Sequence, residues 1–411
     1  MTSEWMNIRA ADFIHFNPRL SIKKGEMATK VGMDRLLPFT KKIPSIEQAV
    51  FTGGTKFSNG DTIMARITPC LENGKTAFVN ILKDGEVGFG STEYIVMRAK
   101  EGISDPQFVY YLATSPFFRN IAIKSMVGSS GRQRVQQGVL DELILTVPRK
   151  VEDQAKIGRV LSELDDKIAL NNEVNDNLAE QIRTLCNSWL SDYEPFGGTC
   201  PDDWEHTPLS SFAKFISGYS YKGSELQEST TAMATIKNFD RKGGFKLDGY
   251  KEIMPSSKLK SEHHVELFDT LVAHTDLTQN AEVIGNAEPV LSFSGYGDII
   301  FSMDVVKVIP DNPAISKFLI AAMLQTRQFK GHCLGYVNGT TVLHLSKKAL
   351  PEYSLMLPKD LSILVPLDEA VSSMYRQMAL NIDENVQLAN LRDSLLPQLM
   401  SGKLDVSGLD L

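Results

Sequence analysis

Residues 161–172 read Leu161-Ser-Glu-Leu-Asp-Asp-Lys-Ile-Ala-Leu-Asn-Asn172, and they belong to a seam that alternates steps of four and three residues from Ile157 to Trp189. A repeat of 3.5 residues kept for about four heptads is typical of a coiled coil, because that period keeps one face turned toward a partner helix. The stretch therefore predicts a long helix paired with another helix. The alternative is an amphipathic helix that lies on its own domain.

A second seam follows 210 residues later, from Leu367 to Leu399, and apart from two central asparagines only Arg392 breaks its apolar pattern. Pro397 is expected to end or kink this second helix near its C-terminus. The two helices together are expected to form a coiled-coil spacer, whose central seam residues are Leu161, Leu164, Ile168, Asn171, Asn175 and Leu178 in the first helix and Val371, Met374, Met378, Asn381, Asn385 and Leu388 in the second.

Two asparagines lie near the middle of each seam, where polar residues cost stability but fix the register of the helices. An antiparallel pair brings Asn171 to Asn385 and Asn175 to Asn381. A parallel pair also aligns asparagine with asparagine, so register alone leaves the direction open. We favour the antiparallel pair, because a duplicated unit most easily buries equivalent surfaces through a twofold axis. It would hold one globular domain at each end of a rod about 50 Å long.

The remainder of the chain repeats with nearly the same offset. Asp61-Thr-Ile-Met-Ala matches Asp269-Thr-Leu-Val-Ala, Gln107-Phe-Val matches Lys317-Phe-Leu, and Ala169-Leu-Asn matches Ala379-Leu-Asn, at offsets of 208 to 210 residues. Several matches in order at one offset indicate a tandem duplication of a unit of about 200 residues.

Each unit is expected to begin with a globular part of mixed character. Short β-rich runs are separated by Gly, Asn and Ser turns, a helical stretch follows, and a strand closes the part. The helical stretches are expected at 106–123 and 313–329, and the closing strands end at Pro148 and Pro358. The predicted fold class is α+β with pseudo-twofold symmetry, divided into domain 1 (1–150), a central helical region (151–194), domain 2 (195–360) and a distal helical region (361–411).

The formal net charge of −7 is the total of four unlike blocks. Lys and Arg exceed Asp and Glu by 6 in residues 1–150, whereas the excess is acidic elsewhere: −6 in 151–194, −3 in 195–360 and −4 in 361–411. Such asymmetry favours different partners for different segments. The total charge by itself argues against a nucleic-acid partner, but the first block does not.

The sequence carries no recognisable motif for catalysis, for a cofactor or for a metal. Asn17-Pro and Asn312-Pro lack the second proline and the aromatic residue of an adenine methyltransferase loop, and Gly74-Lys-Thr has Pro69 where a phosphate-binding loop needs glycine. The four cysteines form no Cys-x-x-Cys pair, and no apolar run approaches the length of a membrane span. We therefore expect a cytoplasmic protein that is not an enzyme by itself and has no cofactor, no metal and no membrane contact.

The helical segments resemble the conserved regions of the specificity (S) subunits of type I restriction-modification enzymes. The likeness is strongest at 161–172 and at Leu391-Arg-Asp-Ser-Leu-Leu-Pro-Gln-Leu-Met-Ser-Gly-Lys-Leu404. Segments 66–75, 217–222 and 147–154 support it more weakly, and the start of the second helix, with Leu357-Pro and Val365-Pro, departs from the first. Essentially the whole chain takes part in the resemblance.

The resemblance implies a non-catalytic subunit of a DNA methyltransferase and restriction endonuclease complex. Two target-recognition domains would read the two halves of a bipartite, asymmetric site in double-stranded DNA, and the helices would set their separation. The helices would also dock two methyltransferase (modification) subunits, and restriction subunits would join them in the full complex. The alternative is a coiled-coil scaffold or inhibitor derived from such a system, whose domains bind protein and do not read DNA.

Candidate base readers are side chains on long glycine-containing loops that can donate to or accept from base edges. In domain 1 the main candidate loop is 128–134, followed by 70–75; in domain 2 the loop at 335–341 aligns with 128–134. The candidate DNA-binding residues are Arg66, Asn73, Lys75, Ser129, Ser130, Arg132, Gln133 and Arg134 in domain 1, and Tyr219, Tyr221, Lys222, His274, Thr275, Asn280, Tyr336, Asn338, Thr340 and Thr341 in domain 2.

Overall fold

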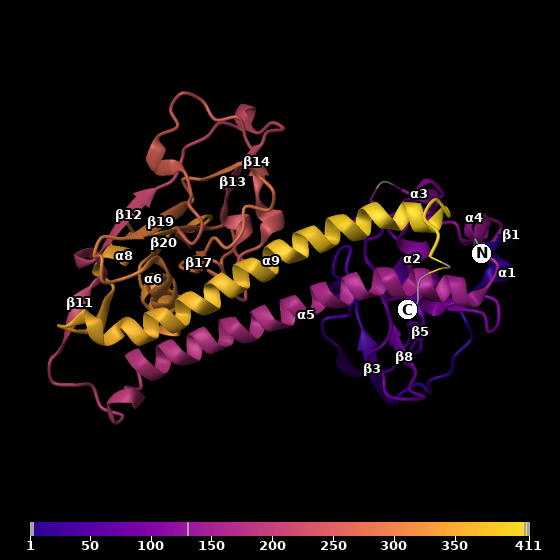
Figure 1. The fold of residues 1–411 in the computed structure, drawn as a ribbon, viewed down its shortest axis with the longest axis horizontal. Helices are drawn as coiled ribbons and strands as arrows, with labels where there is room; N and C mark the ends of the chain where they lie inside the picture. The colour runs from indigo at the N-terminus through magenta and orange to yellow at the C-terminus, as the bar shows by residue number, and fades with distance from the viewer. Residues whose placement is uncertain (1–3, 130, 407, 409–411) are drawn as a thin grey trace. The chain divides into compact units, whose positions relative to one another are not determined.

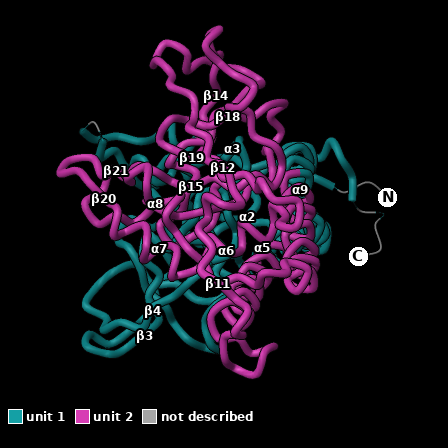
Figure 2. Tube along the Cα trace, turned by 90° about the vertical axis from the view of Figure 1, so that its left-hand side faces the viewer, with its two compact units in different colours: residues 1–170, 387–411 teal, residues 171–386 magenta. Residues whose placement is uncertain are grey.

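Two long helices, α5 (Val151–Leu190) and α9 (Val365–Met400), each contribute to both folding units of the chain. The computed structural model describes residues 4–129, 131–406 and 408. Unit 1 contains residues 1–170 and 387–411, and unit 2 contains residues 171–386 (Figure 2). Each unit therefore consists of a globular domain with the adjoining halves of both helices.

Unit 1 carries three antiparallel or mixed sheets, with strand orders β1-β10, β2-β9-β6-β7 and β4-β3-β8-β5 (Figure 1). Besides its part of the two long helices, its elements are β1 (Trp5–Arg9), α1 (Ala10–Phe13), β2 (Ile14–Phe16), β3 (Met27–Val31), η1 (Met33–Arg35), β4 (Glu47–Val50), β5 (Thr55–Phe57), β6 (Thr62–Ala65), β7 (Thr76–Phe78), β8 (Gly88–Gly90), β9 (Tyr94–Ala99), α2 (Pro106–Thr114), α3 (Pro116–Lys124), α4 (Gln137–Asp141) and β10 (Ile144–Pro148).

Unit 2 has sheets with the orders β11-β22, β12-β19-β15-β17, β14-β13-β18 and β16-β21-β20. Its strands are β11 (Trp204–Pro208), β12 (Ala213–Ser217), β13 (Thr231–Ala234), β14 (Lys251–Glu252), β15 (Thr270–Ala273), β16 (Thr275–Asp276), β17 (Ala287–Pro289), β18 (Asp298–Phe301), β19 (Val305–Pro310), β20 (Val337–Asn338), β21 (Leu343–Leu345) and β22 (Ser354–Pro358). Its helices are η2 (Glu194–Phe196), η3 (Leu209–Ser211), η4 (Gly223–Glu225), η5 (Ile236–Asn238), η6 (Leu247–Gly249), η7 (Ser261–His263), α6 (Lys317–Leu324), α7 (Arg327–Leu334), α8 (Ala349–Glu352) and η8 (Leu361–Leu364), followed by α9.

The two units repeat the same topology. The sheet β2-β9-β6-β7 has its counterpart in β12-β19-β15-β17, β1-β10 in β11-β22, and the parallel pair β3-β8 in β13-β18. Asp61 and its equivalent Asp269 are both ion-paired, although their cations come from different positions on the neighbouring strand: Arg98 meets Asp61 at 2.7 Å in unit 1 and Lys307 meets Asp269 at 3.5 Å in unit 2. The expected tandem duplication and the α+β fold class are confirmed.

The helical stretch expected at 106–123 is present, and Ser115 divides it into the two helices α2 and α3. Ser115 is extended and caps the second helix, with its hydroxyl accepting from the backbone N–H of Phe118 at 3.3 Å. Pro116 follows at the first helical position, where its missing N–H costs nothing. The copy in unit 2 is interrupted in the same way, because Thr326 caps α7 after α6 has ended at Leu324.

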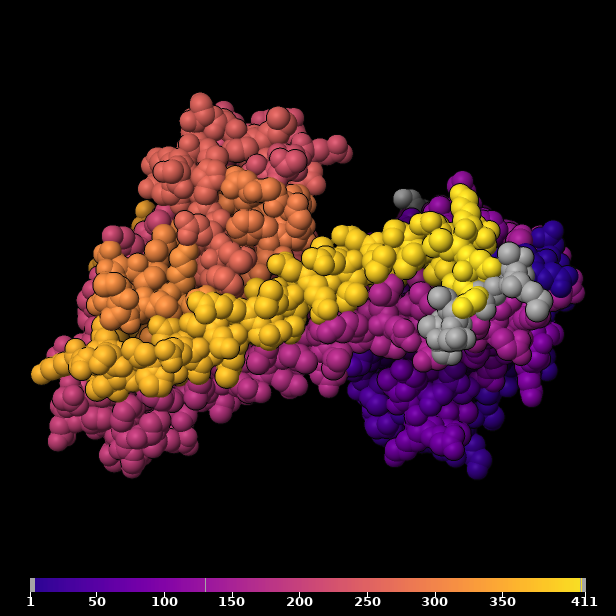
Figure 3. Space-filling model, in the orientation of Figure 1, coloured from indigo at the N-terminus to yellow at the C-terminus, as the bar shows by residue number. Residues whose placement is uncertain are grey.

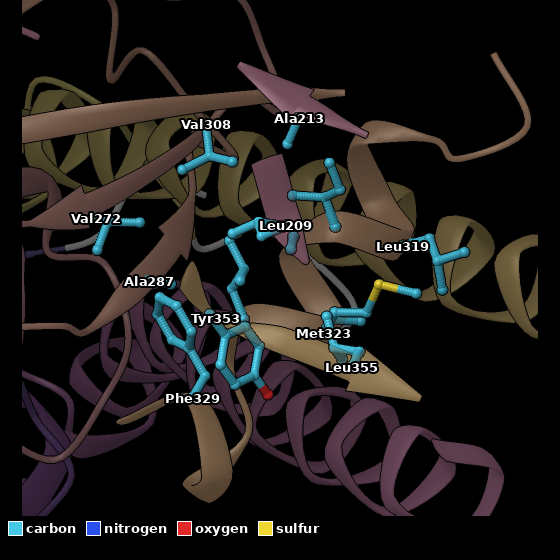
Figure 4. Close-up of a cluster of buried hydrophobic side chains, with 14 of the residues drawn as sticks. Leu209, Ala213, Val272, Ala287, Val308, Leu319, Met323, Phe329, Tyr353 and Leu355 are labelled. Carbon is cyan, nitrogen blue, oxygen red and sulfur yellow. The ribbon is translucent and has the colours of Figure 1, made fainter. Parts of the chain in front are cut away.

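Each domain core includes apolar side chains from both long helices. In unit 1 the core joins Ile157 and Leu161 of α5 to Leu396 and Leu399 of α9. In unit 2 it joins Ile182 of α5 and Val371 and Tyr375 of α9 to the side chains of β12, β15, β19, α6 and α7, some of which are shown in Figure 4. The helices thus pack on the domains as well as on each other, and both interpretations of the seam hold in part.

The central asparagines decide the direction of the helix pair. In unit 2 Asn171 donates to Asn385 Oδ1 at 2.9 Å, and Asn381 donates to Asn175 Oδ1 at 2.8 Å. These are the contacts of an antiparallel pair, so the fold has the direction that we favoured. The side chains of α9 (yellow) lie along α5 (magenta) in Figure 3.

The remaining seam positions are buried or half-buried in both helices. Arg392, which breaks the apolar pattern, pairs through Nη1 with Asp165 of α5 at 2.6 Å in unit 1. Helix α9 continues three residues beyond Pro397 and ends at Met400, so the proline lies in its last turn. The short helix η8 leads into α9, whereas α5 begins almost directly after β10, and the two helix starts differ as expected.

Candidate nucleic-acid interface

In unit 1 the two predicted loops lie against each other. Arg134 forms antiparallel bridges with both Ile67 and Val127, and the N–H of Thr68 donates to Gln133 O at 3.0 Å. The loop at 66–75 and the loop at 127–134 therefore form one surface, although about 60 residues separate them in sequence. Their polar side chains can face one ligand.

Glu93 lies at the centre of this surface. Its carbonyl accepts from the N–H of Arg66 at 2.9 Å, and its carboxylate accepts from Arg134, through Nη2 at 2.7 Å and Nε at 3.0 Å. This ion pair holds the pKa of Glu93 below its usual value. Arg66 Nη2 donates to Val135 O at 3.1 Å, while its Nε is buried without a partner.

The loop at 70–75 is attached to the domain by Arg119, which was not predicted to bind, and by Lys75, which was. Arg119 Nη2 donates to Glu72 O at 2.5 Å, and its guanidinium lies 4.8 Å from the centre of the Phe39 ring. Lys75 Nζ donates to Met33 O at 2.8 Å, so this candidate holds the fold locally. Asn73 is exposed and remains a candidate.

The tip of the loop at 127–134 is exposed at Ser129 and Arg132 and half-buried at Gln133. Ser130 lies outside the described residues. Gly128 has φ of 139°, and a Cβ there would come within 2.9 Å of Arg132 O, so only glycine fits this turn. Gly128 lets the backbone approach Arg132 O closely, and the side chain of Arg132 stays in solvent.

In unit 2 a small sheet joins the corresponding loops. Strand β21 pairs with β16 on one side and β20 on the other, with Thr275 opposite His344 and Asn338 opposite His344. Gln279 Nε2 donates to Thr340 O at 2.7 Å and ties the two loop tips together. Unit 2 thus brings together the segments at 274–280 and 335–341, as unit 1 brings together those at 66–75 and 127–134.

The side chains on this sheet differ in their exposure. Asn280, Asn338, Thr340 and Thr341 are exposed. His274 is half-buried, and burial together with His344 and Lys347 lowers its pKa. Tyr336 donates through its hydroxyl to Glu352 at 2.7 Å. The prediction for Thr275 was wrong insofar as it required an exposed side chain, because Thr275 is buried and only 5% accessible.

The segment 219–222 contains a second correction. Tyr219 is 2% exposed, and its hydroxyl donates to Glu225 at 2.7 Å, so its side chain belongs to the core rather than to the loop surface. Tyr221 packs half-buried on the same cluster, and Lys222 is exposed. The backbone of Tyr219 nevertheless pairs with Ser302, two residues before Asp304, whose carbonyl accepts from His274 at 2.9 Å.

Backbone contacts identify equivalent positions in the two surfaces. In unit 1 the N–H of Arg66 donates to Glu93 O, and Arg66 O accepts from the N–H of Val135. In unit 2 the N–H of His274 donates to Asp304 O, and His274 O accepts from the N–H of Leu345. The residues that the sequence reasoning missed are Glu93, Asp304 and His344, the last of which occupies the place of Arg134. Glu93 and Asp304 are 211 residues apart, which is close to the repeat offset. This spacing of two acidic residues was the signal in the sequence that could have identified them.

Other kinds of site have no support in the described part of the chain. Within it, no cluster of three or more His, Cys, Asp or Glu side chains could hold a metal ion. None of its helices combines the length and the apolar character that crossing a membrane requires.

Comparison with known proteins agrees with this architecture. The sequence profile of the "Type I restriction modification DNA specificity domain" matches residues 2–180. The type I restriction enzyme HindI specificity subunit of Haemophilus influenzae is 22% identical, covering 84% of this chain and 86% of the relative. The MjaVIII specificity subunit of Methanocaldococcus jannaschii is 21% identical over 99% of this chain and 94% of its own length.

The fold is similar as well. A crystal structure of the type I restriction-modification S subunit from M. genitalium superposes with a TM-score of 0.52 at 16% identity, covering 97% of this chain and 96% of that one. The chain is therefore similar to the type I restriction-modification specificity subunits over most of its length, and residues 2–180 match their DNA specificity domain. The resemblance noted in the two helical segments is confirmed, and the relatives extend it over both units of this chain.

Proposed function

We propose that the chain is the DNA sequence-specificity subunit of a type I restriction-modification complex and has no catalytic activity of its own. Domain 1 (1–150) and domain 2 (195–360) each read one half of a bipartite, asymmetric site in double-stranded DNA. The helical regions (151–194 and 361–411) set their separation and dock two methyltransferase subunits. Restriction subunits join the full complex, which works in the cytoplasm where the chromosome lies.

The observation that carries this proposal is the pair of equivalent loop surfaces. Both are built on the same backbone pairings, yet their side chains differ: Arg66 and Arg134 in unit 1 correspond to His274 and His344 in unit 2. Two readers with one scaffold and different polar side chains are what recognition of an asymmetric site requires, because base edges are distinguished by their donors and acceptors.

Charge adds to this support. Residues 1–150 carry an excess of six positive charges, and Arg132 extends into solvent from the loop surface of domain 1. Domain 2 has an excess of three negative charges, so partner subunits must supply much of the phosphate neutralisation for that half-site. The acidic helical regions face partners other than DNA.

Domain exchange tests the proposal. The complex with methyltransferase subunits is assembled with residues 1–150 replaced by those of another family member, and methylated sites are mapped by methylome sequencing. We expect one half of the recognised site to change and the other half to persist. An unchanged site, or the absence of any bipartite footprint from the native complex, would favour the protein-binding scaffold instead.

A further inference from the structure

The ion pair between Glu93 and Arg134 does not serve to hold the loop. The backbone of Arg134 is already fixed by two hydrogen bonds with Val127, at 2.9 and 3.0 Å. The side-chain pair connects residues 41 positions apart and adds two further contacts at the exposed surface. Surface ion pairs contribute little to stability. The pair therefore fixes the orientation of the guanidinium rather than the fold of the loop.

Among the described residues, no hydrogen bond is recorded at the end of the guanidinium opposite Cδ. Glu93 accepts from Nε and Nη2 of Arg134, which form the side edge of the group. Arginine carries five N–H donors in a rigid plane, so both hydrogens on Nη1 and the second hydrogen on Nη2 remain available at its end. The side chain of Arg134 is 46% exposed and that of Glu93 is 24% exposed, so solvent and ligand reach this end.

We infer that Glu93 and Arg134 act as one reading unit, in which Glu93 positions the guanidinium and Arg134 contacts a guanine in the major groove of the half-site read by domain 1. The inference rests on the proposed function. The end of the guanidinium offers two parallel donors, which match the O6 and N7 acceptors of guanine. Because Glu93 restrains the side chain before binding, less conformational entropy is lost when the contact forms.

The charges favour a base over a phosphate as the ligand of Arg134. The ion pair has no net charge, and the carboxylate of Glu93 repels a phosphate group that approaches Arg134. The edge of guanine is neutral, so Glu93 does not repel it, and it needs only the N–H donors of Arg134 that Glu93 leaves available. Arg132, which is exposed on the same loop, is better suited to the phosphate backbone.

Unit 2 provides a natural comparison, because Asp304 and His344 occupy the equivalent positions. Among the described residues, the structure records no hydrogen bond between these two side chains, and His344 Nδ1 instead lies 3.4 Å from Thr275 Oγ1. The half-site read by domain 2 is therefore an internal control for any change made to Glu93 or Arg134.

The test uses the complex with its methyltransferase subunits and DNA duplexes in which each position of both half-sites is varied in turn. Glu93→Gln and Arg134→Lys are compared with the native chain. Glu47→Gln, which removes one charge from the exposed pair with Lys30, is the matched control. We expect a guanine in the half-site of domain 1, and a loss of preference for it of about tenfold or more in Arg134→Lys.

Glu93→Gln should lose part of the same preference, at the same base pair only, and Glu93→Asp should retain more of it than Glu93→Gln. The half-site of domain 2 and the control variant should keep the native profile. The inference is overturned if that half-site of domain 1 contains no guanine, or if Glu93→Gln raises affinity for all sequences alike and leaves base preference intact. If the native complex shows no sequence preference at all, the proposed function itself fails.

Discussion

The two units use the same backbone pairings but stabilise them with different chemistry. At the loop surface, unit 1 has the charged pair of Glu93 and Arg134, whereas unit 2 has Asp304 and His344 at those places. The difference shows that the duplicated scaffold conserves the positions of side chains and leaves their identity free. Under the proposed function, that freedom would allow two copies of one domain to recognise different sequences.

The same contrast occurs where each domain packs on the helices. In unit 1, Asp165 of α5 accepts from Tyr111 of the domain and from Arg392 of α9, both at 2.6 Å. At the positions related by the offset of 210, unit 2 has Tyr375 in place of Asp165 and Ile182 in place of Arg392. The hydroxyl comes from the domain in unit 1 and from the helix in unit 2.

In unit 2 the junction is a chain of hydrogen bonds that ends on a buried acid. Tyr375 donates to Gln325 Oε1 at 2.7 Å, and Gln325 donates to Glu288 at 2.6 Å. Glu288 also accepts from the N–H of Gly244 at 2.7 Å, and no cation among the described residues is bonded to it. Burial raises the pKa of Glu288 to about 7. Unit 1 thus relies on a compensated charge, and unit 2 on a carboxyl group that is stable when protonated.

The largest expected effect is that of Arg392→Met, which leaves the buried carboxylate of Asp165 without its cation. Removal of one partner from a buried ion pair costs about 3–5 kcal/mol. We expect unit 1 to lose about 3 kcal/mol, because Arg392 remains 16% exposed. Hydrogen exchange at 106–124, compared with the equivalent helices at 317–334, reports the two units separately.

Ile182→Val, at the equivalent position in unit 2, is the matched control and should cost about 1 kcal/mol. The double variant Arg392→Met with Asp165→Asn should recover much of the loss, because the buried carboxylate that Arg392 compensated is then removed as well. Equal destabilisation of the two units by Arg392→Met would contradict the contrast drawn between their junctions.

The second effect concerns pH and unit 2. The folded-state pKa of Glu288, about 7, lies above its ordinary value of 4.5, so the native state binds the proton more tightly than the unfolded state does. Stability from this group is therefore present at low pH and is lost as pH rises from 4.5 to 7. The change amounts to about 3 kcal/mol over the whole window.

Urea unfolding of unit 2 between pH 5 and pH 8, followed by hydrogen exchange at 317–334, measures this change. Glu288→Gln keeps the shape without the titrating proton and should flatten the pH dependence. Unit 1, whose junction contains no counterpart of Glu288, serves as the reference within the same sample. A slope that persists in Glu288→Gln would assign the pH dependence to another group.

A smaller effect separates the two tyrosines. Tyr111→Phe removes a hydrogen bond to a carboxylate and should cost unit 1 about 2 kcal/mol, whereas Tyr375→Phe removes a bond to a neutral amide and should cost unit 2 about 1 kcal/mol. Both rings stay in place, so packing is matched. Thermal unfolding at pH 7 with segment-resolved hydrogen exchange shows which of the two variants costs more stability. A larger cost for Tyr375→Phe than for Tyr111→Phe would contradict the conclusion that the hydroxyl of Tyr111 binds a charged carboxylate and that of Tyr375 a neutral amide.

The smallest effect is expected in DNA binding at the loop tips. Arg132→Ala removes an exposed cation from unit 1, so the slope of log affinity against log salt should fall in magnitude by about 0.9 for one lost phosphate contact. Thr340→Ala, at the loop tip of unit 2, should leave the slope unchanged. Titrations of the complex at several salt concentrations measure both. Equal slopes for Arg132→Ala and the native chain would remove Arg132 from the phosphate contacts.

The sequence was a good guide wherever the signal was local or periodic. The heptad seams, the repeat offset and the glycine-rich loops predicted the long helices, the duplication and the segments that meet at each loop surface. The division of the helical stretch at Ser115 was also readable, because serine followed by proline is a helix start. The burial of Tyr219 and Thr275 could not be predicted from the sequence, since it depends on which neighbours cover them.

The chain by itself therefore determined that two copies of one α+β unit, each followed by a long helix, form this protein. Periodicity and self-similarity belong to the order of residues, and they survive without any knowledge of contacts. Only the tertiary structure decided that the helices run antiparallel, because both directions align asparagine with asparagine. It alone brought Glu93 to Arg134 and Asp165 to Arg392, since pairings across 41 and 227 residues arise from packing and leave no local pattern.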